Sequence, residues 1–164
     1  MGLRNLSVFV LFIKEGWEKA FSVAKYLCFL HVTNAYVVTP VQTYGPSMLP
    51  TFDLTESLFL GERISTRFGK VARGDIIILR SPQCPRKYMT KRLVGMEGDT
   101  VTYLSNPKDN DKHETVVVPK GHVWVQGDNI YKSKDSRNFG PVPYGLIESK
   151  MCWRVWPLKN FGPV

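Results

Sequence analysis

Ser47 has a setting that suits a nucleophile. It lies in the segment Gly45–Thr51, GPSMLPT, where a proline stands on either side of it. A residue that precedes a proline is restricted to extended conformations, so the backbone around Ser47 is stiff. Such a backbone holds a reactive side chain in one position. A proline-rich turn with an incidental serine is the alternative, and this segment taken alone favours it.

Lys91 is the second residue that could carry chemistry. It lies in the predicted strand Met89–Gly95, where alternate residues share a face, so that Met89, Lys91 and Leu93 point the same way. Lysine is almost never fully buried unless it is paired. Lys91 is therefore either an edge residue whose amine reaches water or a buried amine with a special role.

Together, Ser47 and Lys91 can form a nucleophile and its general base. A serine hydroxyl needs a base beside it, and lysine can act as that base only when it is neutral. The ordinary pKa of lysine is about 10.4, so roughly one amine in 2,500 is neutral at pH 7. Burial can lower the pKa of lysine by about 3–5 units, which covers the shift of about 3.4 units that is required.

A third region is dense in hydrogen-bonding side chains. It comprises GDN at 127–129 and SKDSRNFGP at 133–141. One interpretation is an exposed polar turn. The other is a support for the pair above, in which Ser133 orients the Lys91 amine while Asp135 and Arg137 form an ion pair that braces the loop.

Short strands would position these residues. The segments are rich in Val, Ile and aromatic residues and are separated by Gly, Pro, Asn and Asp. The predicted strands are Tyr36–Thr43, Ser57–Glu62, Asp75–Arg80, Met89–Gly95, Thr100–Leu104, Glu114–Val118, His122–Gln126 and Met151–Trp156, with a polar loop at Ser105–His113. This spacing predicts a mainly β fold, a compact barrel or sandwich, with few helices after residue 40.

Residues 1–38 follow a different pattern, because apolar side chains recur there every three or four residues and predict a helix. The mainly apolar stretch Phe21–Val38 has 18 residues, slightly fewer than the roughly 20 of a bilayer span. A membrane span, a helix lying in the membrane surface and a helix packed on the domain all remain open. We expect 1–38 to be a helical membrane-associated segment and 39–164 to be the β-rich catalytic domain.

Composition narrows the classes of partner and site. The net charge is +8, which suits nucleic acid, an anionic membrane or acidic partners. The three cysteines are far apart and predict unpaired, mostly buried thiols, although one bridge, such as Cys84–Cys152, remains open. The three histidines lack the spacing of zinc ligands. We therefore expect no metal site and no cofactor.

These segments, together with RGDII at 73–77, occur in an order that resembles the type I signal peptidase family, the Ser/Lys proteases of the S26 clan. Gly45–Thr51 resembles the nucleophile segment of that family, Lys91–Gly95 its general-base segment and Gly127–Gly140 its last segment. Several ordered segments are far more specific than any one of them. The resemblance implies a compact β catalytic domain and the activity of a serine endopeptidase.

The resemblance also implies roles for single residues. It assigns the nucleophile to Ser47, the general base to Lys91 and supporting roles to Ser133, Asp135 and Arg137. Gly45 and Pro46 are the positions where a substrate backbone could approach, bound as an added strand. Many bacterial members have a hydroxyl residue at the position of Gly45, where it completes the oxyanion hole, so the second oxyanion donor is not identified here.

Within the family, the motif GPSMLPT and the small size of the chain are most similar to those of the mitochondrial inner membrane protease branch, subunit 1 type. The run Asp135–Pro143 is similar to its plant members. This similarity implies an inner-membrane protein whose catalytic domain faces the intermembrane space. It also implies precursor proteins carrying sorting signals as substrates, and a second, related protease subunit as partner.

Two other functions remain open. A basic β-barrel module that binds nucleic acid would use the positive charge and aromatic residues such as Tyr88, Tyr131 and Phe139, and would lose affinity steeply with salt. It gives no reason for Ser47 and Lys91 to occur together with the polar run, so we expect no nucleic-acid partner. A non-catalytic subunit of a peptidase complex would keep the fold without the reaction.

Overall fold

The computed structural model describes residues 2–105 and 113–164. Most of the predicted loop Ser105–His113 therefore lies outside the described residues. The chain forms two compact units, Met1–Val37 and Val38–Val164. The sequence predicted the division one residue later, after residue 38.

The first unit is helical. Helix α1 runs from Gly2 to Val32, and the π-helical turn η1 continues it from Thr33 to Val37. This agrees with the three- and four-residue spacing of its apolar side chains. None of the helices in the described part of the chain is both long and apolar enough to cross a membrane. Membrane association of this unit stays a prediction.

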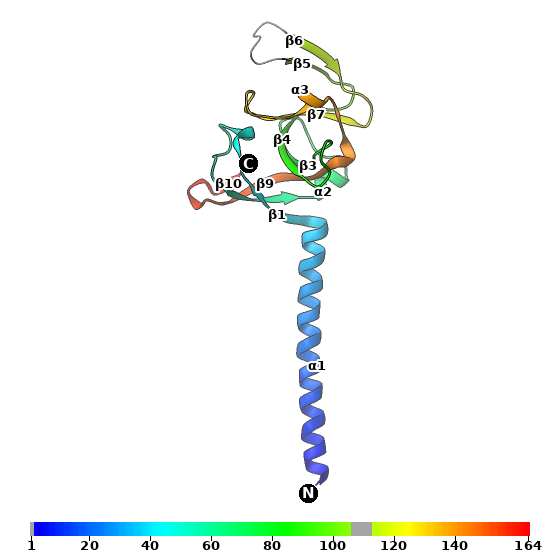
Figure 1. The fold of residues 1–164 in the computed structure, drawn as a ribbon. Helices are drawn as coiled ribbons and strands as arrows, with labels where there is room; N and C mark the ends of the chain where they lie inside the picture. Colours follow the sequence, from blue (N-terminus) through cyan, green and yellow to red (C-terminus); the bar gives the residue numbers. More distant parts are fainter. Residues whose placement is uncertain (1, 106–112) are drawn as a thin grey trace. The chain divides into compact units, whose positions relative to one another are not determined.

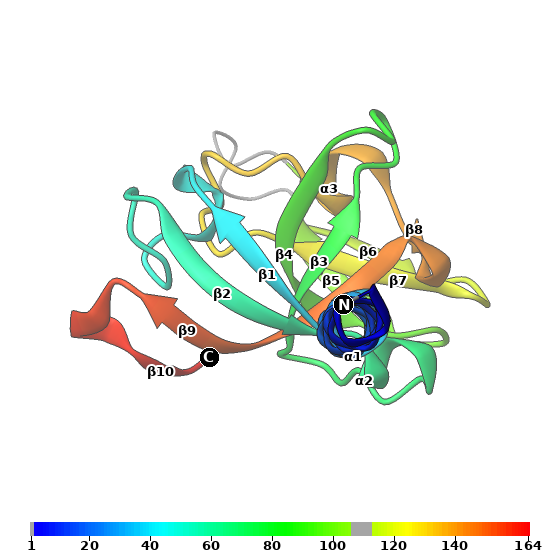
Figure 2. The ribbon, with the colours of Figure 1, turned by 90° about the horizontal axis from the view of Figure 1, so that it is seen from below.

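The second unit is a curled, mainly antiparallel sheet, and Figures 1 and 2 show it curving round on itself. Its strands are β1 Val38–Thr43, β2 Ser57–Glu62, β3 Ile76–Arg80, β4 Tyr88–Gly95, β7 His122–Gln126, β8 Val142–Pro143, β9 Ile147–Trp156 and β10 Gly162–Pro163. Their order is β1-β2-β9-β3-β4-β7-β8, with β10 paired to β9. Strands β5 Thr100–Leu104 and β6 His113–Val117 form a separate two-stranded sheet. The predicted fold class, mainly β with an N-terminal helix, is confirmed.

The predicted strands match the observed ones closely, and three have the expected bounds. The largest difference is at β9, which begins at Ile147, because Ile147 pairs with Leu79 and Lys150 with Ile77 of strand β3. The elements that sequence did not predict are all short: α2 Ile64–Arg67, α3 Ser136–Phe139, the 3-10 turns η2 Pro46–Met48, η3 Tyr144–Leu146 and η4 Leu158–Asn160, and the strands β8 and β10. Segments of two to four residues are too short to show a hydrophobic period.

Strand β3 lies between two hydrophobic clusters, which is why Ile76–Leu79 are buried without interruption. Ile77 and Leu79 pack with Leu93 and Val125. On the other side, a second cluster consists of Ile76, Ile78, Met48, Phe52, Phe59 and Met151. The second cluster contains residues directly after Ser47, so core packing anchors the turn that carries the predicted nucleophile.

The cysteines differ from expectation. Cys28 and Cys84 are exposed and Cys152 is half-buried, and all three are free thiols. The prediction of mostly buried thiols is therefore wrong. Cys84 lies in the loop between β3 and β4, and Cys28 lies on helix α1, whose described side chains are almost all exposed.

Candidate active site

Ser47 lies in the turn η2, directly after strand β1. Gly45 precedes the turn with a φ of 108°, a left-handed conformation that glycine adopts without steric cost. Met48, 2% exposed, fills the core behind Ser47, while Ser47 itself is half-buried. The Asn129 N–H donates to the Ser47 carbonyl oxygen at 3.1 Å. The backbone of the turn is thus fixed from the core side and from the segment that follows β7.

Lys91 is buried in the centre of β4, with only 3% of its surface exposed. It lies opposite Ile77 of β3, on the apolar face that the strand alternation predicts. Burial lowers the pKa of Lys91 to about 8; the carboxylates of Asp135 and Asp128 raise it, while the Arg137 guanidinium lowers it. The amine is therefore far easier to deprotonate than that of a solvated lysine.

Gly127 is where the segments of Ser47 and Lys91 meet. In the antiparallel register of β4 and β7, Arg92 lies opposite Gln126. Lys91 directly precedes Arg92, and Gly127 directly follows Gln126. A Cβ atom added to Gly127 would lie 2.5 Å from the Ser47 carbonyl oxygen and 2.2 Å from Ser133 Oγ. Turn η2 also contacts β4 directly. The Ser47 backbone and the Ser133 side chain thus lie close to Gly127, at the end of the strand that pairs with the strand of Lys91.

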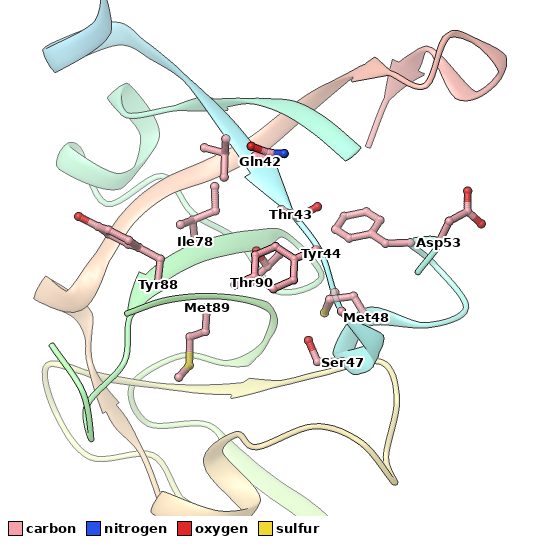
Figure 3. Close-up of a pocket in the computed structure, with 13 residues that line it drawn as sticks. Gln42, Thr43, Tyr44, Ser47, Met48, Asp53, Ile78, Tyr88, Met89 and Thr90 are labelled. Carbon is pink, nitrogen blue, oxygen red and sulfur yellow. The ribbon is translucent and has the colours of Figure 1, made fainter. Parts of the chain in front are cut away.

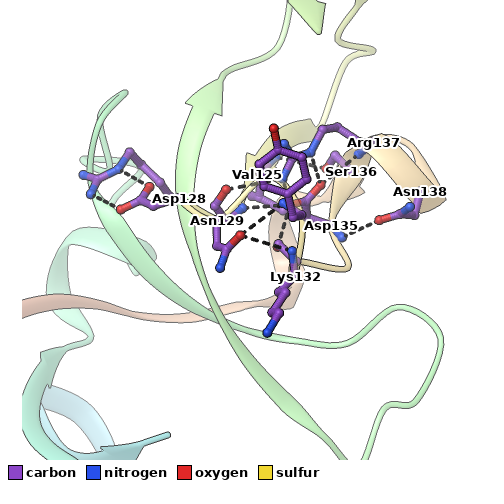
Figure 4. Close-up of polar contacts among 12 residues, drawn as sticks. Val125, Asp128, Asn129, Lys132, Asp135, Ser136, Arg137 and Asn138 are labelled. Atoms are coloured by element: carbon purple, nitrogen blue, oxygen red, sulfur yellow. Dashed lines mark hydrogen bonds and ion pairs between the residues drawn. The ribbon is translucent and has the colours of Figure 1, made fainter. Parts of the chain in front are cut away.

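Asp135 is the centre of a buried polar network beside this meeting point (Figure 4). Its Oδ2 accepts from Arg137 Nη2 at 2.6 Å, Ser133 Oγ at 2.6 Å and the Gly127 N–H at 2.8 Å, while its Oδ1 accepts from Arg137 Nε at 2.9 Å. Burial raises the pKa of Asp135, but these donors outweigh it and bring the pKa below its ordinary value. The carboxylate stays ionised and holds the loop against the end of β7.

The predicted pair of Asp135 and Arg137 is present, with Arg137 only 8% exposed and Asp135 fully buried. The Ser133 hydroxyl donates to Asp135. It was predicted to contact the Lys91 amine, and its oxygen still has lone pairs that can accept a hydrogen bond. Its role toward Lys91 stays a prediction.

Sequence reasoning missed a second polar network at the site. Asp128 accepts from Arg92 Nε at 2.8 Å, from Arg92 Nη2 at 2.7 Å and from Thr51 Oγ1 at 2.5 Å. Arg92 points away from the Lys91 face, and Asp128 resembles an ordinary turn residue in the sequence. The sequence did contain one signal: Arg92 and Asp128, which have opposite charges, lie in two of the three candidate segments.

A cavity of about 270 Å³ opens beside Ser47 (Figure 3). Its lining comes mainly from the end of β1, the nucleophile turn and the start of β4: Val41, Gln42, Thr43, Tyr44, Gly45, Ser47, Met48, Phe52, Asp53, Ile78, Tyr88, Met89 and Thr90. Gly45, predicted to approach substrate, lines this cavity. Pro46, predicted with it, lies in the same turn but is not among the lining residues of the described structure.

Known proteins are similar to this chain over most of its length. A family model described as signal peptidase, peptidase S26, matches residues 16–108 and 104–156. The mitochondrial ATP-independent inner membrane protease subunit 1a of Arabidopsis thaliana is 52% identical over 149 residues, covering 91% of this chain and 89% of the relative.

Two related proteins of Saccharomyces cerevisiae are also similar. Mitochondrial inner membrane protease subunit 1 is 36% identical, covering 82% of this chain and 77% of the relative. Subunit 2 is 38% identical, covering 79% of this chain and 74% of the relative. With the family match extending from residue 16 to residue 156 and a relative that shares half of its residues, the chain belongs to the signal peptidase family, peptidase S26.

Proposed function

We propose that this chain is a serine endopeptidase that removes sorting peptides from imported precursor proteins, with Ser47 as nucleophile and Lys91 as general base. One arrangement supports the proposal. Lys91 is almost fully buried and directly precedes Arg92, which pairs with Gln126 at the end of β7. At the next residue, Gly127, an added Cβ atom would lie 2.5 Å from the Ser47 carbonyl oxygen. Membership of the signal peptidase family supports the reaction class.

The lowered pKa makes Lys91 a usable base near neutral pH. With a pKa of about 8, about one Lys91 amine in eleven is neutral at pH 7. At the ordinary value of 10.5, about one in three thousand would be neutral. Burial thus raises the population of the competent base roughly 300-fold, without any metal or cofactor.

The proposed reaction has two stages. Lys91 Nζ takes the proton of Ser47 Oγ as the oxygen attacks the substrate carbonyl carbon, and the resulting ammonium then gives a proton to the leaving amine. This step leaves an ester between Ser47 and the substrate's N-terminal fragment. In the second stage Lys91 takes a proton from water, the hydroxide attacks the ester, and Ser47 Oγ recovers its proton.

The surrounding groups support this reaction. Ser47 lies in the first turn of η2, where backbone N–H groups lack partners within the turn, so its N–H can donate to the oxyanion. Gly45 offers no side-chain donor in this role. We assign Ser133, Asp135 and Arg137 to orientation: the ionised Asp135 fixes Ser133 and the Gly127 N–H at the end of β7, the strand that pairs with the strand of Lys91.

We propose that the substrate binds as an extended strand along β1. Strand β1 is at the edge of the sheet, with β2 as its neighbour, and an edge strand can accept a further strand through its backbone. The cavity at the end of β1 lies beside Ser47 and receives a substrate side chain. Gly45 and Pro46 lie where the substrate backbone would approach Ser47.

The names of the relatives support a location and a partner. The relatives from Arabidopsis thaliana and Saccharomyces cerevisiae are named mitochondrial inner membrane proteases, and the latter species has two related subunits. We propose the mitochondrial inner membrane as the location, with the β unit in the intermembrane space, the helical unit associated with the membrane, and a second, related subunit as partner. Binding of nucleic acid would leave the buried Lys91 and the polar networks without a role.

Two substitutions test the proposal on a peptide that spans a sorting-signal junction. Ser47→Ala removes the nucleophile and should lower cleavage by at least about 10³-fold. Lys91→Arg keeps a positive charge that cannot be lost, and should be equally inactive. The wild-type kcat should rise with pH around a midpoint of about 8, because Lys91 must lose its proton first.

The matched control is Ser65→Ala, which changes a serine of α2 that is not among the residues lining the cavity, and should cleave at the wild-type rate. Cleavage by Ser47→Ala at the wild-type rate would reject the proposed nucleophile. The same rate in Lys91→Arg would exclude lysine as the base. Inactivity of the well-folded wild-type protein, alone and with its partner, would favour a non-catalytic subunit.

A further inference from the structure

Thr51 is a polar residue near Ser47 with no part in the reaction as described so far. It ends the segment that carries the nucleophile, and its side chain is not among those that line the cavity. Its hydroxyl donates to Asp128 Oδ2 at 2.5 Å. Although Thr51 itself is exposed, the Asp128 side chain is only 15% exposed, so this bond has an ionised and largely buried acceptor.

Asp128 in turn holds the strand of the general base. Both of its oxygens accept from Arg92, at 2.8 and 2.7 Å, which is the bidentate geometry that fixes a guanidinium most firmly. Arg92 Nη1 also donates to the Gly74 carbonyl oxygen at 2.8 Å. Since Arg92 directly follows Lys91 on β4, the path Thr51–Asp128–Arg92 links the nucleophile segment to the base strand.

The link acts at one end of the nucleophile segment, and other bonds hold the rest. The Asn129 N–H holds the Ser47 carbonyl oxygen. Arg154 Nη2 donates to the Thr51 carbonyl oxygen at 3.1 Å, while its guanidinium lies 5.3 Å from the centre of the Phe52 ring. These contacts fix the segment to the core and to β9. The Thr51 hydroxyl fixes it to the carboxylate that also positions β4.

We propose that Thr51 is a positioning residue for the reaction assigned above, an inference that rests on the proposed function. Its hydroxyl, through Asp128 and Arg92, sets the separation of Ser47 Oγ and Lys91 Nζ while contacting neither. Proton transfer requires the two atoms within hydrogen-bond reach, and a displacement of about 1 Å can lower a rate about 100-fold. Loss of the hydroxyl should therefore slow the chemical step and leave substrate binding intact.

Thr51→Val removes the hydroxyl and keeps the shape, and Thr51→Ser keeps the hydroxyl and removes a methyl group. In the full chain, with the junction peptide as substrate, we expect Thr51→Val to lower kcat about tenfold with KM within about twofold. Thr51→Ser should restore kcat to within about threefold of wild type. The midpoint of the pH profile should stay near 8 in both variants, because Thr51 is not among the groups that shift the pKa of Lys91.

The matched control is Thr55→Val, which changes another exposed threonine a few residues away. Within the described ranges its hydroxyl has no hydrogen-bond partner, so this variant should match wild type. Circular dichroism establishes that each variant is folded. If Thr51→Val does not fold, Thr51→Ala carries the same expectation without the added bulk of valine.

A wild-type kcat in Thr51→Val, or in Thr51→Ala if that variant is used, would overturn the inference. An equal loss in Thr51→Ser would show that the hydroxyl is not what matters. A rise in KM alone would make Thr51 a substrate contact, and a shifted pH midpoint would make its effect electrostatic. Activity in Ser47→Ala would reject the proposed function in a separate measurement. A failure of the proposed function can therefore be distinguished from a failure of this inference.

Discussion

At the scale of single residues, Lys91 shows how the property that a general base needs can oppose stability. Burial lowers its pKa to about 8 from 10.5, so the folded state binds the proton more weakly than the unfolded chain does. A pKa difference of this size corresponds to about 3 kcal/mol. The protonated Lys91 amine therefore destabilises the folded state, at a position where an apolar side chain would carry no such penalty.

The first prediction concerns the stability of Lys91→Met. At pH 7 the lysine is mostly protonated in both the folded and the unfolded state, so wild type carries the full penalty. Removing it should raise the free energy of unfolding by up to about 3 kcal/mol. Above pH 10.5 the amine is neutral in both states, and the advantage of the variant should vanish. Urea unfolding of both proteins across pH 7 to 10.5 measures the difference.

The control is Lys87→Met, which replaces an exposed lysine at the start of the same strand region. It should change the unfolding free energy by less than about 0.5 kcal/mol at any pH. A Lys91→Met protein less stable than wild type at pH 7 would mean that the amine is favourably solvated in the folded state. The low pKa, and with it the supply of neutral base, would then be rejected.

Sequence predicted that Lys91 lies on the apolar face of its strand but did not predict the partners of Asp128, and the difference has a physical reason. Strand alternation alone puts Lys91 on the face of Met89 and Leu93, so its burial follows from a local rule. The partners of Asp128 are Thr51 and Arg92, 77 and 36 residues away. Only the folded sheet brings these segments together, and no local period encodes such a meeting.

At the scale of elements, the three residues that follow β7 connect the parts of the site. The Gly127 N–H is held by Asp135, the Asp128 side chain by Arg92 and Thr51, and the Asn129 N–H holds Ser47. Sequence identified this segment as a dense polar run. It could not show that successive residues contact α3, β4 and the nucleophile turn in that order.

The second prediction concerns Gly127, a position where neighbouring atoms approach so closely that a glycine is required. An alanine methyl group there would lie 2.5 Å from the Ser47 carbonyl oxygen, which is backbone and cannot turn aside. We expect Gly127→Ala to displace the nucleophile turn and to lower kcat about 100-fold while the sheet still folds. Steady-state kinetics on the junction peptide, with circular dichroism, provides the measurement.

Gly145→Ala is the matched control, because an added Cβ there meets no atom within 4 Å. It should leave kcat and stability unchanged. Wild-type activity in Gly127→Ala would mean that the turn yields without cost. The position of Ser47 would then not depend on the segment after β7.

At the scale of the whole molecule, the chain consists of two units of different structure. The described part of the first unit is almost entirely helix, with exposed apolar side chains such as Trp17, Phe21 and Phe29. The second unit contains the three hydrophobic clusters and every residue of the proposed site. Sequence predicted a division after residue 38, because a helical period gives way there to an alternating one.

The last prediction is that a chain shortened to residues 38–164 folds alone and remains a peptidase. Its clusters lie wholly within the unit, so it should unfold in one cooperative thermal transition and cleave a soluble junction peptide with kcat within about threefold of the full chain. It should fail to float with vesicles containing anionic lipid, whereas the full chain should float, because the exposed apolar side chains of α1 are missing. Ser47→Ala in the short chain provides the inactive reference. A short chain that is folded but inactive would place part of the catalytic apparatus in residues 1–37, and equal flotation of both chains would assign membrane binding to the β unit.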